Sequence, residues 1–201
     1  MRLGIYGGSF DPVHMGHLLL AECCREQCRL DEVWFMPASI PPHKRTTPPV
    51  DPRHRLAMLE LAVADNPAFR VSSWEIERGG VSYTAETLAE LRRARPGDEL
   101  FFLLGADALA DLPTWRAPAQ IAATATLVSV RRAGVEAPPL EKLAEAAGED
   151  AVRRIAAHQV VMPMIELSSR ELRARIAAGQ GLRYRTPAAV ERYIIEHRLY
   201  V

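Results

Sequence analysis

Apolar residues in this chain fall into short continuous runs that alternate with stretches of helical period. The runs at residues 3–6, 33–37 and 99–104 are typical of strands buried on both faces of a parallel sheet. Between the first two runs, Leu18, Ala21, Cys24 and Cys28 recur near the helical period, which predicts a helix over residues 18–29. A strand, a helix and a strand within about forty residues indicate a βαβ unit with parallel strands.

The rest of the chain continues this alternation. Asp51 followed by Pro52 is typical of a helix start, and the apolar face after it predicts a helix through Ala64. Further strands are predicted at residues 69–76, 125–130 and 159–165, where Pro163 suggests an edge or an irregular end. Further helices are predicted at residues 88–93 and 186–197, and a short one within a variable excursion at residues 133–148. The pattern predicts one α/β domain over residues 1–201: a doubly wound parallel sheet with flanking helices and a small C-terminal helical segment.

Charge balance and the distribution of apolar residues argue against several classes of protein. Lys plus Arg and Asp plus Glu both number 25, so the formal charge is zero, whereas a nucleic-acid binder of this size usually shows a basic excess. The longest apolar stretch, residues 100–112, contains Asp107 and Asp111 and is too short to span a bilayer. The first strand begins at Leu3 without the basic and apolar segments of a secretion signal. We therefore expect a cytoplasmic protein that binds neither nucleic acid nor a membrane.

The three cysteines, Cys23, Cys24 and Cys28, crowd onto one predicted helix. An odd and local set is a poor disulfide framework, which predicts reduced thiols. Cys24 and Cys28 could share a helical face with His17, and such a face could hold a metal. Because free cysteine commonly behaves as a small buried hydrophobe, we favour burial and expect no metal site built from protein side chains.

The stretch that follows the first strand carries the clearest chemistry. Residues 7–17 are Gly-Gly-Ser-Phe-Asp-Pro-Val-His-Met-Gly-His. Adjacent glycines let the backbone approach a ligand closely, and the helix that follows offers free N–H groups and a positive dipole end to an anion. His14 and His17 are three residues apart and share one face of the first turn. Two imidazoles placed there can donate hydrogen bonds to phosphoryl oxygens.

Two other groups of residues lie beyond the carboxyl ends of predicted strands, where open α/β sheets bind ligands. Lys44 lies in a proline-rich loop, residues 38–50, from which it could reach phosphates or simply face solvent. Gly105 and Asp107 end a strand, and Asp107 can accept hydrogen bonds from ribose hydroxyls. Trp115 offers a flat face to a pyridine ring, although ordinary burial would explain it as well.

Hydroxyl residues begin two of the later helices. Ser168 and Ser169 can present hydroxyls and backbone N–H groups to phosphates, and Arg173 can turn its guanidinium to the same site. A capped amphipathic helix would account for the same pattern. Thr84 and Thr87 precede the helix at residues 88–93, and a role as a simple cap is the alternative there.

Together these residues resemble the nucleotidylyltransferase superfamily with an H-x-G-H motif, and within it the bacterial nicotinate-nucleotide adenylyltransferases. The matching segments are G-G-S-F-D-P-x-H-x-G-H, P-x-x-K, T-x-x-T and G-A-D-x-x-x-x-L-x-x-W, and Leu-Ser-Ser-Arg-x-Leu-Arg resembles the family's I-S-S-T-x-I-R. Arg170 stands where that family has threonine, so the role of that threonine does not transfer. The two common phosphate-binding motifs, G-x-G-x-x-G and G-x-x-x-x-G-K-[ST], are absent from the sequence.

The resemblance implies a Rossmann-like fold and the transfer of AMP from ATP to nicotinate mononucleotide, without a covalent enzyme intermediate. It implies catalytic roles for His14, His17, Lys44 and Arg173. It also implies contacts to ATP and its phosphates from Gly8, Ser9, Phe10, Gly16, Ser168 and Ser169, and contacts to nicotinate mononucleotide from Thr84, Thr87, Gly105, Asp107 and Trp115. Mg²⁺ is expected as the cofactor, held mainly through the ATP phosphates, because magnesium keeps several waters and few protein ligands.

Two other functions share parts of this pattern. A sister enzyme of the same fold would adenylylate nicotinamide mononucleotide or phosphopantetheine, and Thr84, Thr87 and Trp115 argue against it. A non-catalytic nucleotide sensor would keep the phosphate-binding turn. The presence of His14, His17, Lys44 and Arg173 together argues against that alternative.

Overall fold

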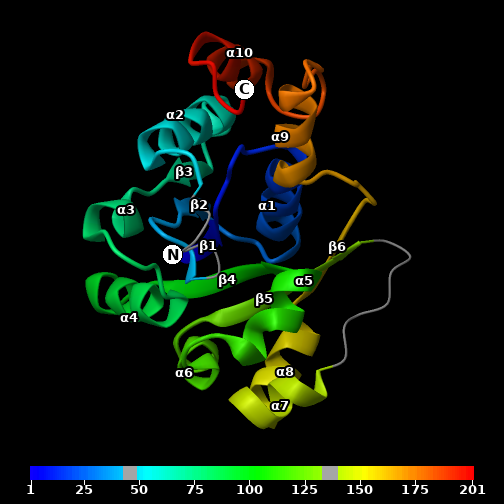
Figure 1. The fold of residues 1–201 in the computed structure, drawn as a ribbon. Coiled ribbons are helices and arrows are strands. Elements are labelled where there is room, and N and C mark those ends of the chain that lie inside the picture. Colours follow the sequence, from blue (N-terminus) through cyan, green and yellow to red (C-terminus); the bar gives the residue numbers. More distant parts are fainter. Residues whose placement is uncertain (43–48, 133–139) are drawn as a thin grey trace.

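The centre of the molecule is a six-stranded sheet in which every pair of neighbouring strands is parallel. The computed structural model describes residues 1–42, 49–132 and 140–201. The strand order is β3-β2-β1-β4-β5-β6 (Figure 1). The strands are β1 (Arg2–Gly8), β2 (Glu32–Pro37), β3 (Phe69–Val71), β4 (Glu99–Gly105), β5 (Thr126–Arg132) and β6 (Gln159–Met162). The predicted doubly wound, Rossmann-like sheet is confirmed, and its strand order reverses between β1 and β4.

Helices cover both faces of the sheet (Figure 1). One face packs against α1 (Met15–Gln27), α2 (Pro52–Val63), α9 (Ser169–Ala177) and α10 (Ala188–Glu196). The other packs against α4 (Thr84–Ala94), α5 (Ala106–Asp111), the 3₁₀ turn η2 (Leu112–Thr114), α6 (Pro118–Thr124), α7 (Glu141–Ala147) and α8 (Glu149–Ala157). The short helix α3 (Trp74–Arg78) follows β3 and places Trp74 against the second of these cores.

The central strand β4 explains why its sequence is continuously apolar. Phe101 and Leu103 point into the core under α1 and α2, whereas Leu100, Phe102 and Leu104 point into the core under α4 and α6. Because successive side chains of a strand alternate between faces, a strand covered on both sides needs apolar residues at every position. All five side chains are at most 4% exposed.

Several predicted boundaries differ from the observed ones. The strand predicted at residues 69–76 ends at Val71, and its second half forms α3, in which the carboxylate of Glu75 is buried. The strand predicted at residues 159–165 ends at Met162, one residue before Pro163, which has no N–H to donate to the sheet. Helix α4 begins at Thr84 rather than at residue 88, and helices α5, α6 and α8 were not predicted.

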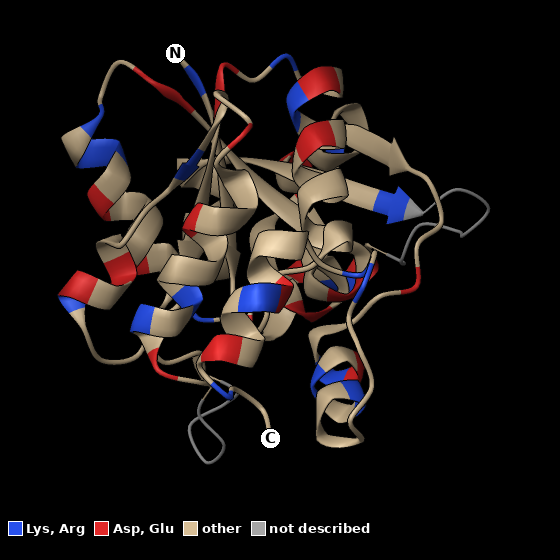
Figure 2. Cartoon of the chain, turned by 90° about the horizontal axis from the view of Figure 1, so that it is seen from above, with Lys and Arg blue, Asp and Glu red and all other residues tan. Residues whose placement is uncertain are grey.

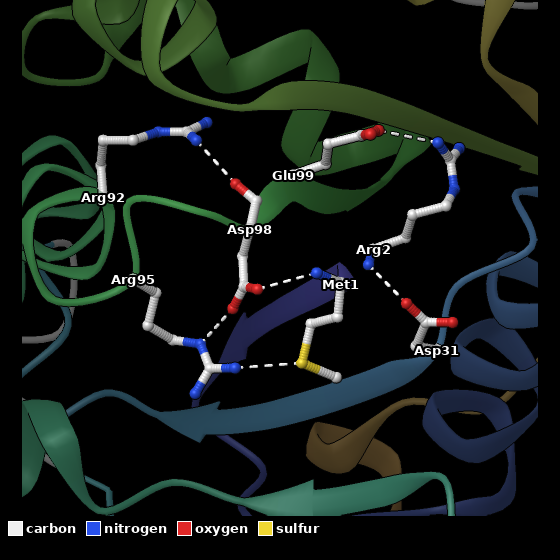
Figure 3. A network of polar contacts seen from close by, with 7 residues as sticks. All are labelled: Met1, Arg2, Asp31, Arg92, Arg95, Asp98 and Glu99. Carbon is white, nitrogen blue, oxygen red and sulfur yellow. Dashed lines mark hydrogen bonds and ion pairs between the residues drawn. The ribbon is translucent and has the colours of Figure 1, made fainter.

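A network of polar contacts holds the amino-terminal edge of the sheet, on the side opposite the carboxyl ends of the strands. Asp98 accepts from the amino group of Met1 at 2.8 Å and from Arg95, and its carbonyl accepts from Arg92 at 2.7 Å (Figure 3). Arg2 donates from its backbone to Asp31 and from its guanidinium to Glu99. These contacts fix the start of β1 to the start of β4.

Charged residues of both signs are interspersed over the helices, as expected from the zero formal charge (Figure 2). All three cysteines are free; Cys24 and Cys28 are buried, and burial raises the pKa of both thiols. No helix within the described ranges is long and apolar enough to cross a membrane.

Candidate functional site

The turn between β1 and α1 is shaped by close packing around Gly8. A Cβ at Gly8 would lie 3.0 Å from the ring of Phe10, so a side chain there would displace a buried aromatic ring. Phe10 takes a left-handed φ of 47° and packs edge-on against Tyr6 and His17 at 5.3 and 5.1 Å between ring centroids. Any contact between Phe10 and ATP would therefore be made by its backbone rather than by its side chain.

The two histidines of the motif form a stacked pair at the start of α1. Their ring centroids are 3.6 Å apart and the rings are inclined by 19°. The backbone N–H of His14, the N-cap residue, donates to Nδ1 of His17 at 3.2 Å. Because Nδ1 of His17 accepts this hydrogen bond, the proton of the neutral ring is on Nε2, and Nε2 is the atom that can donate to a ligand.

Burial keeps both imidazoles neutral. Burial lowers the pKa of His14 to about 4, and burial together with the neighbouring His14 lowers the pKa of His17 well below its ordinary value. The His14 Nδ1 atom is buried and has no hydrogen-bond partner among the described residues. Because this atom is buried against Gly16, it is not the atom of His14 that a ligand can reach.

The absence of a side chain at Gly16 leaves room for the ring of His14. A Cβ at Gly16 would lie 3.1 Å from Nδ1 and 3.2 Å from Cε1 of His14. Even the methyl group of alanine would press on this ring and shift it. The glycine between the two histidines is therefore required by the packing of the His14 ring.

Helix α9 brings a second group of predicted residues to the same turn, from more than 150 positions along the chain. Ser169 Oγ donates to the carbonyl of Pro12 at 2.9 Å, and Arg173 Nη1 donates to the carbonyl of Asp11 at 2.6 Å. Ser168 is the N-cap and accepts from the backbone of Glu171 at 3.2 Å. The amino-terminal ends of α1 and α9 thus meet beside the histidines.

A cavity of about 880 Å³ opens at the carboxyl ends of β1 and β2. Its wall includes Gly8, Ser9, Thr84, Thr87 and Trp115 from the predicted set. The remaining members of its wall are mostly apolar, among them Ile5, Met36, Pro41, Pro42, Leu88 and Phe102. The cavity is therefore suited to a flat ring with a few polar substituents.

Trp115 contributes to this wall from the end of η2. It is half-buried, and its ring meets Phe102 edge-on at 6.2 Å between centroids. Arg116 follows it in the wall, with its guanidinium 4.6 Å from the centroid of the Tyr83 ring and paired with Glu86 at 2.7 Å.

Thr87 already makes two hydrogen bonds. Its hydroxyl donates to Glu75 Oε1 at 2.6 Å and accepts from Arg78 Nη2 at 3.0 Å. A hydroxyl has a single hydrogen, so in this arrangement Thr87 has none to donate to a substrate. Thr84, one turn earlier at the start of α4, lies in the same wall.

Some predicted residues lie neither at the histidine turn and the start of α9 nor in the wall of the cavity. Asp107 is exposed in the first turn of α5, and neither it nor Gly105 belongs to the wall of the cavity. Lys44 lies outside the described residues. Among the described residues, no group of three or more His, Cys, Asp or Glu side chains is placed to hold a metal ion.

Arg55 was missed by the sequence analysis. It is fully buried, and its guanidinium donates to the carbonyls of Ser9, Ala38, Ser39 and Val50 at 2.7–3.2 Å. This one side chain joins the turn after β1 to the loop after β2. An arginine on the same helical face as Leu59 and Ala62 was the available signal, because an unpaired charge is rarely placed in a core.

Comparison with known proteins identifies the family. A model of the cytidylyltransferase-like family matches residues 5–175. A probable nicotinate-nucleotide adenylyltransferase of Thermus thermophilus is 44% identical over 200 residues, with 100% of both chains covered. That of Thermomicrobium roseum is 44% identical over 99% of this chain and 91% of the relative.

Solved structures agree on the fold. The nicotinic acid mononucleotide adenylyltransferase of Plasmodium falciparum, complexed with NaAD, superimposes with a TM-score of 0.77 at 17% identity and covers 99% of this chain and 97% of that one. A second structure of the same protein, complexed with APC, gives a TM-score of 0.75. The chain therefore belongs to the cytidylyltransferase-like family and, within it, to the nicotinate-nucleotide adenylyltransferases.

Proposed function

We propose that this protein transfers AMP from ATP to nicotinate mononucleotide, forming nicotinate adenine dinucleotide and pyrophosphate in NAD biosynthesis. The observation that carries the proposal is that one turn after β1 leads to the neutral histidine pair and also supplies Gly8 and Ser9 to a cavity of about 880 Å³ whose wall contains Thr84 and Trp115. The names of the relatives and the NaAD complex of the Plasmodium falciparum protein support the same substrates.

The proposed reaction is an in-line displacement at the α-phosphorus of ATP. The 5′-phosphate of the mononucleotide attacks, the bond to the β-phosphate oxygen breaks, and pyrophosphate leaves with the bond's electrons. The protein supplies no nucleophile, so catalysis rests on positioning and on charge stabilisation. His17 donates from Nε2 to the oxygens of the α-phosphate, where negative charge is redistributed, and His14 acts beside it on the bridging region.

Arg173, Ser168, Ser169 and Lys44 are assigned to the β- and γ-phosphates. Arg173 uses one N–H for the Asp11 carbonyl, and a guanidinium has five. The other donors of Arg173 can therefore meet the leaving pyrophosphate. Gly8, Ser9, Phe10 and Gly16 would contact ATP through the turn and the first residues of α1. ATP is expected as its magnesium complex, with the ion held through the phosphates.

Nicotinate mononucleotide is assigned to the cavity. Trp115 would stack on the pyridine ring and Thr84 would meet its carboxylate, while Thr87 would act through Glu75 and Arg78. Gly105 and Asp107 are assigned to the ribose. The cytoplasmic location expected from the sequence stays a prediction.

The test is pyrophosphate release from ATP and Mg²⁺ with nicotinate mononucleotide, nicotinamide mononucleotide and phosphopantetheine run side by side. We expect a strong preference for nicotinate mononucleotide. A preference for either other acceptor would assign the chain to a sister activity. ATP binding without turnover on any of the three would instead indicate a nucleotide sensor.

A further inference from the structure

Asp11 occupies the centre of a buried hydrogen-bond network at the histidine turn. It is 4% exposed, and its two carboxylate oxygens have different partners. Oδ1 accepts from the hydroxyl of Tyr200 at 2.8 Å and from the backbone of Val50 at 3.4 Å. Oδ2 lies 3.5 Å from Nη1 of Arg173, the same atom that donates to the Asp11 carbonyl at 2.6 Å.

The direction of this network follows from the chemistry of its members. A carboxylate can only accept, so the Tyr200 hydroxyl must be the donor. Burial, and next the neighbouring Asp11, raise the pKa of Tyr200 well above its ordinary value, so the hydroxyl keeps its proton. Tyr200 thereby holds one oxygen of Asp11, and the other remains directed at the guanidinium.

Among the described residues, Arg173 is held only by Asp11. Its side chain is 32% exposed, and within the part of the chain that the structure describes its hydrogen bond and its ion pair are with Asp11 alone. A long, partly exposed side chain loses much rotamer freedom when it binds a phosphate, and a partner that fixes it beforehand reduces that loss. Asp11 is that partner for Arg173.

We propose that Tyr200 is a positioning residue, which fixes the guanidinium of Arg173 for the terminal phosphates of ATP by holding the Asp11 carboxylate. The proposal rests on the proposed function, which assigns Arg173 to those phosphates. Tyr200 and Asp11 are not part of the cavity wall assigned to the mononucleotide. The effect of Tyr200 is therefore directed at ATP and not at nicotinate mononucleotide.

Tyr193 provides a matched control for this role. It lies seven residues before Tyr200, and its hydroxyl also makes one hydrogen bond, to His54 Nδ1 at 2.9 Å, which joins α10 to α2. Tyr193→Phe therefore weakens the docking of the C-terminal segment without touching Asp11. Tyr200→Phe removes a hydroxyl from the same segment and does release Asp11.

The experiment measures the ATP dissociation constant by calorimetry with Mg²⁺ for the wild type, Tyr200→Phe and Tyr193→Phe. Tyr200→Phe should weaken ATP binding about tenfold, the scale of one hydrogen bond to a charged group, and leave the KM for nicotinate mononucleotide unchanged. Tyr193→Phe should leave both quantities unchanged. Equal losses in the two variants, or no loss in Tyr200→Phe, would overturn the proposal.

A double-mutant cycle separates positioning from general packing. If Tyr200 acts through Arg173, then Tyr200→Phe should add almost nothing to the loss of ATP affinity already caused by Arg173→Met. Additive losses would mean that Tyr200 acts by another route. A wild type that binds ATP but adenylylates no acceptor would contradict the proposed function, whereas the calorimetric comparison would still decide the role of Tyr200.

Discussion

In the histidine pair, burial and the closeness of the two rings set the protonation state of both residues. With centroids 3.6 Å apart, two protonated rings would repel strongly, and burial penalises even one charge. Both rings are therefore kept neutral, and the hydrogen bond from the His14 backbone sets the tautomer of His17. A neutral donor can stabilise negative charge that develops on a phosphate without binding the product pyrophosphate as tightly as a cation would.

The first prediction concerns His17. We expect His17→Ala to lower kcat about 10²-fold, because one oriented donor to developing charge is lost. Steady-state turnover with nicotinate mononucleotide measures it, and His158→Ala, at a position half-exposed on the far edge of the sheet, serves as the control. An unchanged kcat would remove His17 from the mechanism.

The second prediction concerns the pH dependence of stability. The folded state lowers the pKa of His14 to about 4 from 6.5, so between these values the unfolded chain binds a proton that the folded chain refuses. The stability associated with the neutral ring is complete above about pH 6.5 and is lost as the pH falls towards 4, by roughly 3 kcal/mol at most.

Urea unfolding at about pH 7.5 and pH 4.5 measures this loss. His14→Gln does not titrate, so its free energy of unfolding should fall less than that of the wild type over the same interval. Equal falls in the two proteins would show that His14 is not held neutral by the fold.

At the scale of elements, α3 and α4 are joined by a network that sequence patterns do not reveal. Thr87 of α4 links Glu75 and Arg78 of α3, and Arg78 also pairs with Glu90 at 3.0 Å. We expect Thr87→Val to lower the free energy of unfolding by about 2 kcal/mol, because it leaves a buried carboxylate without its donor.

The network also predicts which of Thr84 and Thr87 contributes more to the preference for nicotinate over nicotinamide mononucleotide. Since the Thr87 hydrogen is given to Glu75, Thr84→Val should reduce the preference for nicotinate over nicotinamide mononucleotide more than Thr87→Val does. Rates with the two acceptors, set beside urea unfolding of each variant, measure this. A loss of selectivity in Thr87→Val at wild-type stability would mean that Thr87 contacts the substrate directly.

Elements whose own sequence carries a clear period or a continuous apolar run were predictable, as the helices α1, α2 and α10 also show. The double-sided burial of β1, β2 and β4 produces continuous apolar runs, and these three strands were predicted within a few residues. Half of residues 69–76 are apolar, which resembles a strand. The second half nevertheless forms α3, because Glu75 binds Thr87 and Trp74 binds Glu90 on α4. Those contacts are tertiary, so no local pattern could indicate them.

At the scale of the molecule, the reversal of strand order between β1 and β4 brings distant segments to one place. The histidine turn, the start of α9 and the last residues of the chain converge on Asp11, and the cavity opens beside Gly8. The resemblance to a known family indicated the site residues that lie within its motifs. It could not indicate that Asp11 links Arg173 to Tyr200, since neither partner is near it in sequence.

Arg55 joins the two parts of the site, because it binds the carbonyl of Ser9 in the turn after β1 and those of Ala38 and Ser39 in the loop after β2. We expect Arg55→Met to lower the free energy of unfolding by about 3–5 kcal/mol, since it leaves several buried carbonyls without donors. ATP affinity should fall as well, because Arg55 holds the turn that carries Ser9, which is assigned to ATP.

Arg53 supplies the control for Arg55, because it is on the same helix with a side chain that is 88% exposed and paired only with Asp51 among the described residues. Exposed ion pairs contribute little, so Arg53→Met should leave the free energy of unfolding close to that of the wild type. The free energy of unfolding of Arg55→Lys should lie between those of Arg53→Met and Arg55→Met. An ammonium keeps the charge but cannot reach carbonyls on several segments at once. If urea unfolding gave equal values for Arg53→Met and Arg55→Met, the buried guanidinium would not be what holds the turn against the loop.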